Sequence, residues 1–285
     1  MSAQTEQHVI DAQRRDWNRV ANGWEKWDPF FERQMTFLNH RLVGDARLGP
    51  GQRVLDLGSG TGYPALLAAQ IVGAGGQVIG MDLAEEMLSV AEKKAARLGL
   101  SNVHFRAGDV SALPFDDHSF DAVISRFCLM FLPDIQRAAS EIARVLKPGG
   151  WVAASVWAAP EKNPSISGSM AAIKQVVDLP QPDPGAPGIF RLARPGDLAG
   201  MLQRAGLVDL AEEEFLGEWS YASPEEYYRS LMELAAPIQN LMATLLPAQV
   251  EEVKGRVLEA GRTAMRDGRV VFPITMRMVA ARRPR

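Results

Sequence analysis

Three glycines that follow an acidic residue have the clearest chemical meaning in this chain. Residues 54–64 read Val-Leu-Asp-Leu-Gly-Ser-Gly-Thr-Gly-Tyr-Pro, so Gly58, Gly60 and Gly62 occupy alternate positions. A backbone without Cβ can turn tightly and lie directly against a ligand. The proline stands where a helix should begin, and the start of a helix offers free N–H groups. The segment therefore predicts a strand–turn–helix unit that binds a nucleotide-like ligand.

The spacing and charge of this turn indicate which ligand it binds. A dinucleotide-binding turn reads G-x-G-x-x-G, which brings the helix start to a pyrophosphate. Here the third glycine comes one residue early, and Tyr63 stands where Gly or Ala would be needed. Asp56 would repel a diphosphate but suits a ligand with an ammonium and a sulfonium charge. The pattern resembles motif I of the class I S-adenosylmethionine (SAM)-dependent methyltransferases; an ordinary glycine-rich turn is the alternative.

Two further acidic residues follow later strands. Asp82 lies 20 positions after Gly62, at the end of a short apolar run. Its carboxylate can accept hydrogen bonds from both ribose hydroxyls, and it can also cap the helix that follows. The resemblance implies that Asp109 and the next backbone N–H hold the adenine edge. The cofactor-binding residues that it implies are Asp56, Gly58, Ser59, Gly60, Gly62, Asp82, Leu83, Met87, Asp109, Val110 and Ser125.

The resemblance extends over residues 54–157. A turn over 113–119 leads into a strand over 120–125, and the pattern of 138–146 predicts a helix that 147–150 stops. A fifth strand is expected over 151–157. The phrase Arg-Val-Leu-Lys-Pro-Gly-Gly before that strand is typical of this family.

The implied fold is an α/β, Rossmann-like, doubly wound sheet of seven strands, of which the last is antiparallel. Residues 207–221 read as strand six and 269–281 as the last strand. We expect one methyltransferase domain over 1–285. Its parts are an N-terminal helical lid (1–49), a SAM-binding core (50–157), a connector with a helix and strand six (158–222), a helical cap insertion (223–267) and the last strand with its tail (268–285).

The two helical parts decide what surrounds the cofactor. Trp17, Trp24 and Trp27 are spaced so that one helix face could carry all three, either packed on the sheet edge or as a lid. Residues 224–266 read as helices broken at Pro237 and Pro247. Their apolar residues exceed one stripe, so we expect a substrate cap, with a dimer surface as the alternative. A connector rich in proline and glycine precedes them, with Pro180, Pro182, Pro184, Gly185, Pro187 and Gly188.

Composition excludes several classes of function. With 31 Lys and Arg against 34 Asp and Glu, the chain has no broad basic field to capture nucleic acid. The single cysteine, Cys128, excludes an internal disulfide and a cysteine-cluster metal site, and it counts against arsenite-methylating relatives. Without an apolar run of 18 residues we expect no stable membrane insertion and a cytoplasmic protein.

The acceptor side departs from the nearest branch, the ubiquinone and menaquinone methyltransferases. That branch carries an Arg-Asn pair where this chain has Met130-Phe131, and Glu-Phe-Ser where this chain has Ser155-Val156-Trp157. Both changes make the site more apolar and speak against a quinone. The acceptor pocket is expected to include Trp24, Trp27, Arg126, Phe127, Met130, Phe131 and Trp157.

We therefore expect methyl transfer to a small, largely apolar or lipid-like acceptor through O, N or C. A sulfonium methyl is already activated, and holding the acceptor in line with it can supply roughly 7–11 kcal/mol. No metal and at most one general base are expected, with His40 as the candidate and His8 as a second. The alternatives are a non-catalytic SAM-binding regulator and a nicotinamide-dependent Rossmann oxidoreductase.

Overall fold

One mixed β-sheet organises the molecule. The structure is a computed structural model that describes residues 3–179, 183 and 185–285, so Pro180, Pro182 and Pro184 of the predicted connector lie outside the described residues. The strand order is β3-β2-β1-β4-β5-β8-β6. The strands are β1 (Arg53–Leu57), β2 (Gln77–Asp82), β3 (Val103–Ala107), β4 (Phe120–Arg126), β5 (Leu146–Trp157), β6 (Val208–Tyr221), β7 (Met265–Arg266) and β8 (Arg269–Arg282).

The direction of the strands confirms the predicted fold class. β1 to β5 run parallel to their neighbours, whereas β8 pairs antiparallel with both β5 and β6. The central strands are apolar along their length, and Val54, Leu55 and Ile124 are fully buried. This is expected of parallel strands that helices cover on both faces. The two-residue β7, which forms a hairpin with β8, was not predicted.

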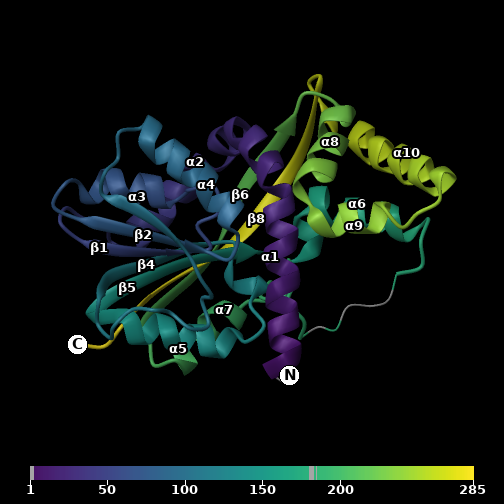
Figure 1. Cartoon of the computed structure of the whole chain (residues 1–285). Helices are drawn as coiled ribbons and strands as arrows, with labels where there is room; N and C mark the ends of the chain where they lie inside the picture. Colours follow the sequence, from purple (N-terminus) through teal and green to yellow (C-terminus); the bar gives the residue numbers. More distant parts are fainter. Residues whose placement is uncertain (1–2, 180–182, 184) are drawn as a thin grey trace.

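Helices cover both faces of the sheet and gather at one end of it. In Figure 1, α2, α3 and α4 lie on one side of the sheet and α5 and α7 on the other, whereas α6, α8, α9 and α10 form a separate group beside β6 and β8. The bounds are α1 (Ala3–Lys26), α2 (Asp28–Asp45), α3 (Ala65–Val72), α4 (Glu85–Arg97), α5 (Ile135–Val145), α6 (Pro164–Lys174), α7 (Asp197–Arg204), α8 (Pro224–Leu234), α9 (Ala236–Met242) and α10 (Pro247–Thr263).

Among the described residues there are three apolar cores, and two of them, a larger and a smaller one, correspond to these two groups of helices. The larger core lies between the sheet and the helices α2, α3, α5 and α7. The smaller one joins α6, α8 and α10 to the far ends of β6 and β8, around the fully buried Tyr227. Tyr227 donates a hydrogen bond from its hydroxyl to the carbonyl of Ser165 (2.6 Å), so α8 is fixed to α6. Pro237 and Pro247 lie in the first turns of α9 and α10, where a proline is tolerated.

Two local predictions were wrong. The helix expected to reach Leu146 ends at Val145, and residues 146–150 belong to β5, where Gly149 takes a left-handed backbone (φ 81°) at a register shift against β4. The helix face expected to carry Trp17, Trp24 and Trp27 does not form, because α1 ends at Lys26. Trp27 instead packs in the smaller core.

Candidate cofactor and acceptor site

The glycine turn lies at the carboxyl edge of the parallel strands. Leu57 pairs with Met81 on one side and with Ser125 on the other, so the residues that follow β1, β2 and β4 meet at the same edge. The three glycines differ in what surrounds them. A Cβ at Gly58 would lie 2.3 Å from the Cβ of Cys128, and one at Gly62 would lie 2.9 Å from Leu66.

Gly60 is the glycine with open space beside it. A Cβ there would meet no atom within 4 Å, and the residue takes a left-handed backbone (φ 52°). Gly58 and Gly62 are therefore required by packing inside the protein. Gly60 is free of such contacts, so a ligand can lie directly against its backbone.

Asp56 is a buried carboxylate that is only half satisfied. Its Oδ2 accepts a hydrogen bond from the backbone N–H of Ala65 at the start of α3 (3.1 Å), but its Oδ1 has no hydrogen-bond partner among the described residues. Burial raises the pKa of Asp56 to about 7, against the lowering effects of the Ser59 hydroxyl and the Arg126 guanidinium. An unpaired buried acceptor is costly, and a cationic donor supplied by a ligand would satisfy it.

Asp82 connects the glycine turn to the start of α4. Its Oδ2 accepts from the N–H of Gly60 (2.8 Å) and its Oδ1 from the N–H of Ala84 (2.9 Å). Burial raises its pKa, and these backbone N–H groups oppose the rise. Each carboxylate oxygen has a second lone pair, so the group can still accept hydrogen bonds from a ligand beside Gly60.

The remaining predicted cofactor residues lie on the same edge in different environments. Asp109 is half-buried, and its Oδ1 accepts from the N–H of Ser111 (2.8 Å). Val110 and Met87 are buried, and Leu83 is half-buried. Ser125 is fully buried, and its hydroxyl donates to the carbonyl of Leu57 (3.0 Å), so it joins β4 to β1.

Aromatic rings from distant parts of the chain form a connected cluster that includes three residues predicted for the acceptor pocket. Phe127 stacks on Trp157 (centroids 4.3 Å apart), and Trp157 meets Trp219 edge to face (5.2 Å). Trp24 stacks on Phe31 (4.7 Å). All of these except Trp157 are half-buried, so their rings retain surface that a small molecule can contact.

The other residues predicted for the acceptor pocket differ in how deeply they are buried and in what they contact. Phe131 is half-buried and meets Trp17 edge to face (5.6 Å). Met130 is 1% exposed and belongs to the larger core. Trp27 is 6% exposed, and its indole N–H donates to Glu233 Oε2 (2.6 Å).

A half-buried arginine at the end of β4 connects that strand to α2. Arg126 Nη1 donates to Asn39 Oδ1 (2.8 Å), and Asn39 lies on α2. Burial lowers the pKa of Arg126, and the charge of Asp56 opposes this effect. The guanidinium has five N–H donors, so it can hold a further acceptor atom.

The helix α1 crosses the open edge of the site. Arg14 Nε donates to the carbonyl of Leu83 (3.3 Å), Asn18 Oδ1 accepts from the N–H of Glu86 (3.0 Å), and Gln13 Nε2 donates to the carbonyl of Phe131 (2.7 Å). These contacts place α1 over the segments that follow β2 and β4. Figure 1 shows the helix running between the cofactor half and the helical group.

At its other end, α1 is attached to α8. Lys26 forms an ion pair with Glu233 (2.6 Å), and the indole N–H of Trp24 donates to the carbonyl of Leu234 (3.3 Å). A Cβ at Gly23 would lie 2.1 Å from the carbonyl oxygen of Glu233. The two helices are therefore in backbone contact.

The sequence analysis missed a polar cluster around the buried Lys94 that holds α2 against the glycine turn. Lys94 Nζ lies 2.6 Å from Asp28 Oδ1, and the lysine side chain is 6% exposed. The Tyr63 hydroxyl donates to Glu32 Oε1 (2.5 Å), and Lys94 also lies over the Tyr63 ring (4.1 Å). Burial lowers the pKa of Lys94, which Asp28 opposes. One signal was available, because Lys94 falls on the apolar face of its helix, four positions after Val90.

The histidines lie outside this arrangement of buried groups. His40 is exposed on α2, and its Nδ1 lies 2.9 Å from the carbonyl of Thr36. His8, His104 and His118 are exposed as well. Within residues 3–179, 183 and 185–285, no cluster of three or more His, Cys, Asp or Glu side chains could hold a metal ion.

Comparison with known proteins agrees with this geometry. Residues 55–154 match the family described as a methyltransferase domain. The match begins in β1 and ends in β5, so it contains the glycine turn, Asp82 and Asp109. Over this segment the chain is therefore similar to a methyltransferase domain.

Relatives of this methyltransferase domain act on different acceptors. An arsenite methyltransferase of Halobacterium salinarum is 43% identical over 142 residues, which are 47% of this chain and 36% of that protein. A demethylmenaquinone methyltransferase of Bacillus cytotoxicus is 42% identical over 103 residues, 36% of this chain and 44% of that protein. The chain thus spans less than half the length of both relatives.

A solved structure supports the fold beyond the matched segment. The YcgJ protein of Bacillus subtilis superposes with a TM-score of 0.58 at 21% identity, covering 87% of this chain and 98% of that protein. Separately, no described helix is both long enough and apolar enough to span a bilayer.

Proposed function

We propose that this chain transfers a methyl group from SAM to a small, largely apolar or lipid-like acceptor through an O, N or C nucleophile. Two observations carry the proposal together: the buried Oδ1 of Asp56 has no hydrogen-bond partner among the described residues, and the backbone of Gly60 in the turn that follows β1 has open space beside it. A ligand with an ammonium group satisfies that oxygen. A dinucleotide brings a diphosphate to the same place, where a carboxylate repels it.

The cofactor contacts proposed from the sequence fit this arrangement. Asp56, Gly58, Ser59 and Gly60 would bind the methionine end of SAM. Asp82, next to Gly60, would accept the ribose hydroxyls, and Asp109 with Val110 would hold the adenine.

The acceptor side supports an apolar acceptor with one polar group. Phe127, Trp157, Trp24 and Phe31 offer aromatic surface, and the half-buried Arg126 directly precedes Phe127 in the chain. Aromatic walls with one placed polar group are typical of small-molecule sites. The helices α8, α9 and α10 are proposed as the cap of this pocket, with a homodimer surface as the alternative use of the same group.

Arsenite and quinones are not the acceptors that we propose. Cys128 is the single cysteine of the chain, and burial raises the pKa of its thiol. A thiol that is held protonated is a poor ligand for arsenic, because the thiolate is the reactive form. The apolar residues Met130 and Trp157 replace polar residues of the menaquinone branch, which speaks against a quinone.

Catalysis is proposed to depend on proximity. Bound SAM supplies an activated methyl group, and this chain binds the two reactants in line and excludes water from between them. We propose no metal, and His40 is the base to test because it lies on the helix that also carries Asn39. A phenol or amine needs little help, whereas an aliphatic hydroxyl needs a base beside it.

Two measurements separate the alternatives. Titration calorimetry with SAM and with NAD distinguishes a methyltransferase site from an oxidoreductase site, and NAD binding without SAM binding would sink the proposal. A screen of phenols, amines and fatty acids with radiolabelled SAM then tests turnover. If SAM binds but no acceptor of any class is methylated, the chain is a SAM-binding regulator.

A further inference from the structure

A second pocket lies at the opposite end of the strands from the glycine turn. It has a volume of about 560 Å³. It is bounded by the end of α2, by Gly149 and Trp151 of β5, by the first residues of β6 and by the end of β8. The parallel strands present their carboxyl ends to the cofactor site, whereas Trp151 pairs with Ala122 near the start of β4 and with Arg282 at the end of β8. The two sites therefore do not share residues.

Arg47 occupies a backbone position that usually favours glycine. It follows the last turn of α2 with a left-handed backbone (φ 53°), and the N–H of Leu48 returns to the carbonyl of Val43 (3.1 Å). Glycine is the common residue at this position of a helix end, and another residue there is strained. The Arg47 guanidinium lies over the Trp151 ring, 3.8 Å from its centroid.

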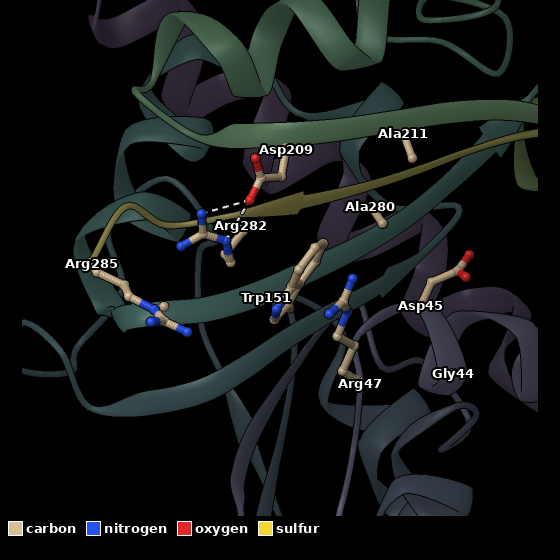
Figure 2. A pocket seen from close by; sticks show the side chains of 10 residues that line it. Gly44, Asp45, Arg47, Trp151, Asp209, Ala211, Ala280, Arg282 and Arg285 are labelled. Atoms are coloured by element: carbon tan, nitrogen blue, oxygen red, sulfur yellow. Dashed lines mark hydrogen bonds and ion pairs between the residues drawn. The ribbon is translucent and has the colours of Figure 1, made fainter.

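A β-bulge positions a second arginine on the same pocket. The pairing of β6 with β8 shifts between Val208 and Ala211, and Asp209 takes a left-handed backbone (φ 55°). Its carboxylate lies 2.6 Å from the guanidinium of Arg282. Figure 2 shows the guanidinium groups of Arg282 and Arg47 on either side of Trp151. Bulges commonly redirect a side chain in this way.

Among the charged side chains of the pocket, Arg47 is available to bind an anion. Asp209 is paired with Arg282, and the other acidic group of the pocket, Asp45, accepts both of its hydrogen bonds from Arg41. Arg47 is in no ion pair with a carboxylate in the part of the chain that the structure describes. The wall of the pocket also includes two small residues, Ala211 and Ala280 (Figure 2).

We propose that this pocket binds a small organic anion. The N–H edge of the Arg47 guanidinium holds its carboxylate or phosphate, and its apolar body lies on Ala211 and Ala280. A guanidinium that is stacked on an aromatic ring keeps its N–H edge free for an oxyanion, which it binds with two parallel hydrogen bonds. Carboxylate and phosphate share this chemistry, and the test separates them.

The test uses titration calorimetry of the full chain with phenyl phosphate, benzoate and inorganic phosphate. We expect phenyl phosphate or benzoate to bind with a Kd below about 1 mM, more tightly than inorganic phosphate, which has no apolar body. The tighter of the two aromatic probes identifies the oxyanion. Saturating SAM should leave the affinity unchanged, because the pocket and the glycine turn lie at opposite ends of the strands.

Arg47→Gly is the decisive variant. It removes the guanidinium while giving the helix end the residue that its backbone favours, so the melting temperature should stay level or rise. Loss of charged hydrogen bonds should weaken binding of the aromatic probe at least about tenfold. Arg97→Gln, which removes an exposed charge from α4, should bind like the wild type. An unchanged Kd in Arg47→Gly, displacement of the probe by SAM, or no aromatic binding in the wild type would overturn the proposal.

Discussion

The proposed cofactor side and the proposed acceptor side of the site are built in different ways. The cofactor side consists of short segments, each of which follows its own strand and carries its chemistry within a few consecutive residues. The acceptor side brings together α1, α2, the segment after β4, the end of β5 and β6. A substitution on the cofactor side can therefore alter one contact at a time. A substitution on the acceptor side shifts surfaces that several elements share.

Of the substitutions considered, Gly60→Val should cause the largest change, a loss of SAM affinity that is confined to the cofactor side. The side chain would occupy the open space beside Gly60, so SAM affinity should fall by more than about a hundredfold. Gly99→Val is the matched control, because Gly99 also has a positive φ (66°) and open space but lies at the end of α4. Calorimetry should show normal SAM binding in the control; equal losses in both variants would attribute the effect to backbone strain.

Asp82→Ala should weaken SAM binding at least about tenfold, because each hydrogen bond lost from a charged group costs roughly 1.5–3 kcal/mol. Part of the loss would come through Gly60, whose N–H the carboxylate holds. The exposed Asp116→Ala is the control for the removal of a carboxylate. Wild-type SAM affinity in a folded Asp82→Ala protein would remove Asp82 from the site.

The pKa of Asp56 predicts how pH acts on both binding and stability. Its value of about 7 lies above the ordinary 3.8, so the folded chain favours the protonated form. This contribution to stability is complete below about pH 4 and is lost as pH rises to about 7. A SAM ammonium needs the ionised form, so its Kd should fall about tenfold between pH 6 and 8.

Asp56→Asn should flatten this pH profile. The change in Kd for SAM over the same range should shrink to less than about twofold, with weaker binding throughout. A pH profile identical to that of the wild type would assign the titration to another group.

Trp24→Leu should separate the two sides. Loss of its stacking on Phe31 should lower kcat/KM for the acceptor about two- to tenfold, while the Kd for SAM changes by less than about twofold. Phe37→Leu, which disturbs the stacked pair with Phe215 outside the site, is the control. Loss of SAM affinity in Trp24→Leu would show that α1 serves both ligands equally.

His40→Ala should have the smallest effect. The ring is exposed and already contacts a backbone carbonyl, so turnover should stay within about twofold of the wild type, with or without EDTA. A general base typically contributes about 10²–10⁴-fold. A loss of that size with unchanged SAM affinity would make His40 the base.

The difference between the two sides also decides what the sequence could predict. The glycine turn and Asp109 each come just after a short strand and Asp82 ends one, and parallel strands bring such ends to one edge. The order of the strands does not predict the contacts that α2 makes. Lys94 and Asp28 are 66 positions apart, and Arg126 and Asn39 are 87 apart, so no local pattern connects them.

The errors in the fold prediction have a similar cause. Proline and two glycines at 148–150 indicate a break, but pairing with β4 and β8 keeps the segment within β5. In the same way, helical spacing placed Trp27 with Trp17 and Trp24, whereas its hydrogen bond to Glu233 draws it toward α8. Tertiary contacts override local preference in both places.

The contact between Gly23 and α8 restricts how this chain can change during evolution. Any side chain at position 23 would meet the Glu233 carbonyl, so even alanine would push α1 away from α8. The aromatic residues beside it can be exchanged for others of similar size without moving a helix. New acceptors are therefore expected to arise through substitutions at Trp24 or Phe31, while position 23 stays glycine in every descendant that keeps α1 on α8.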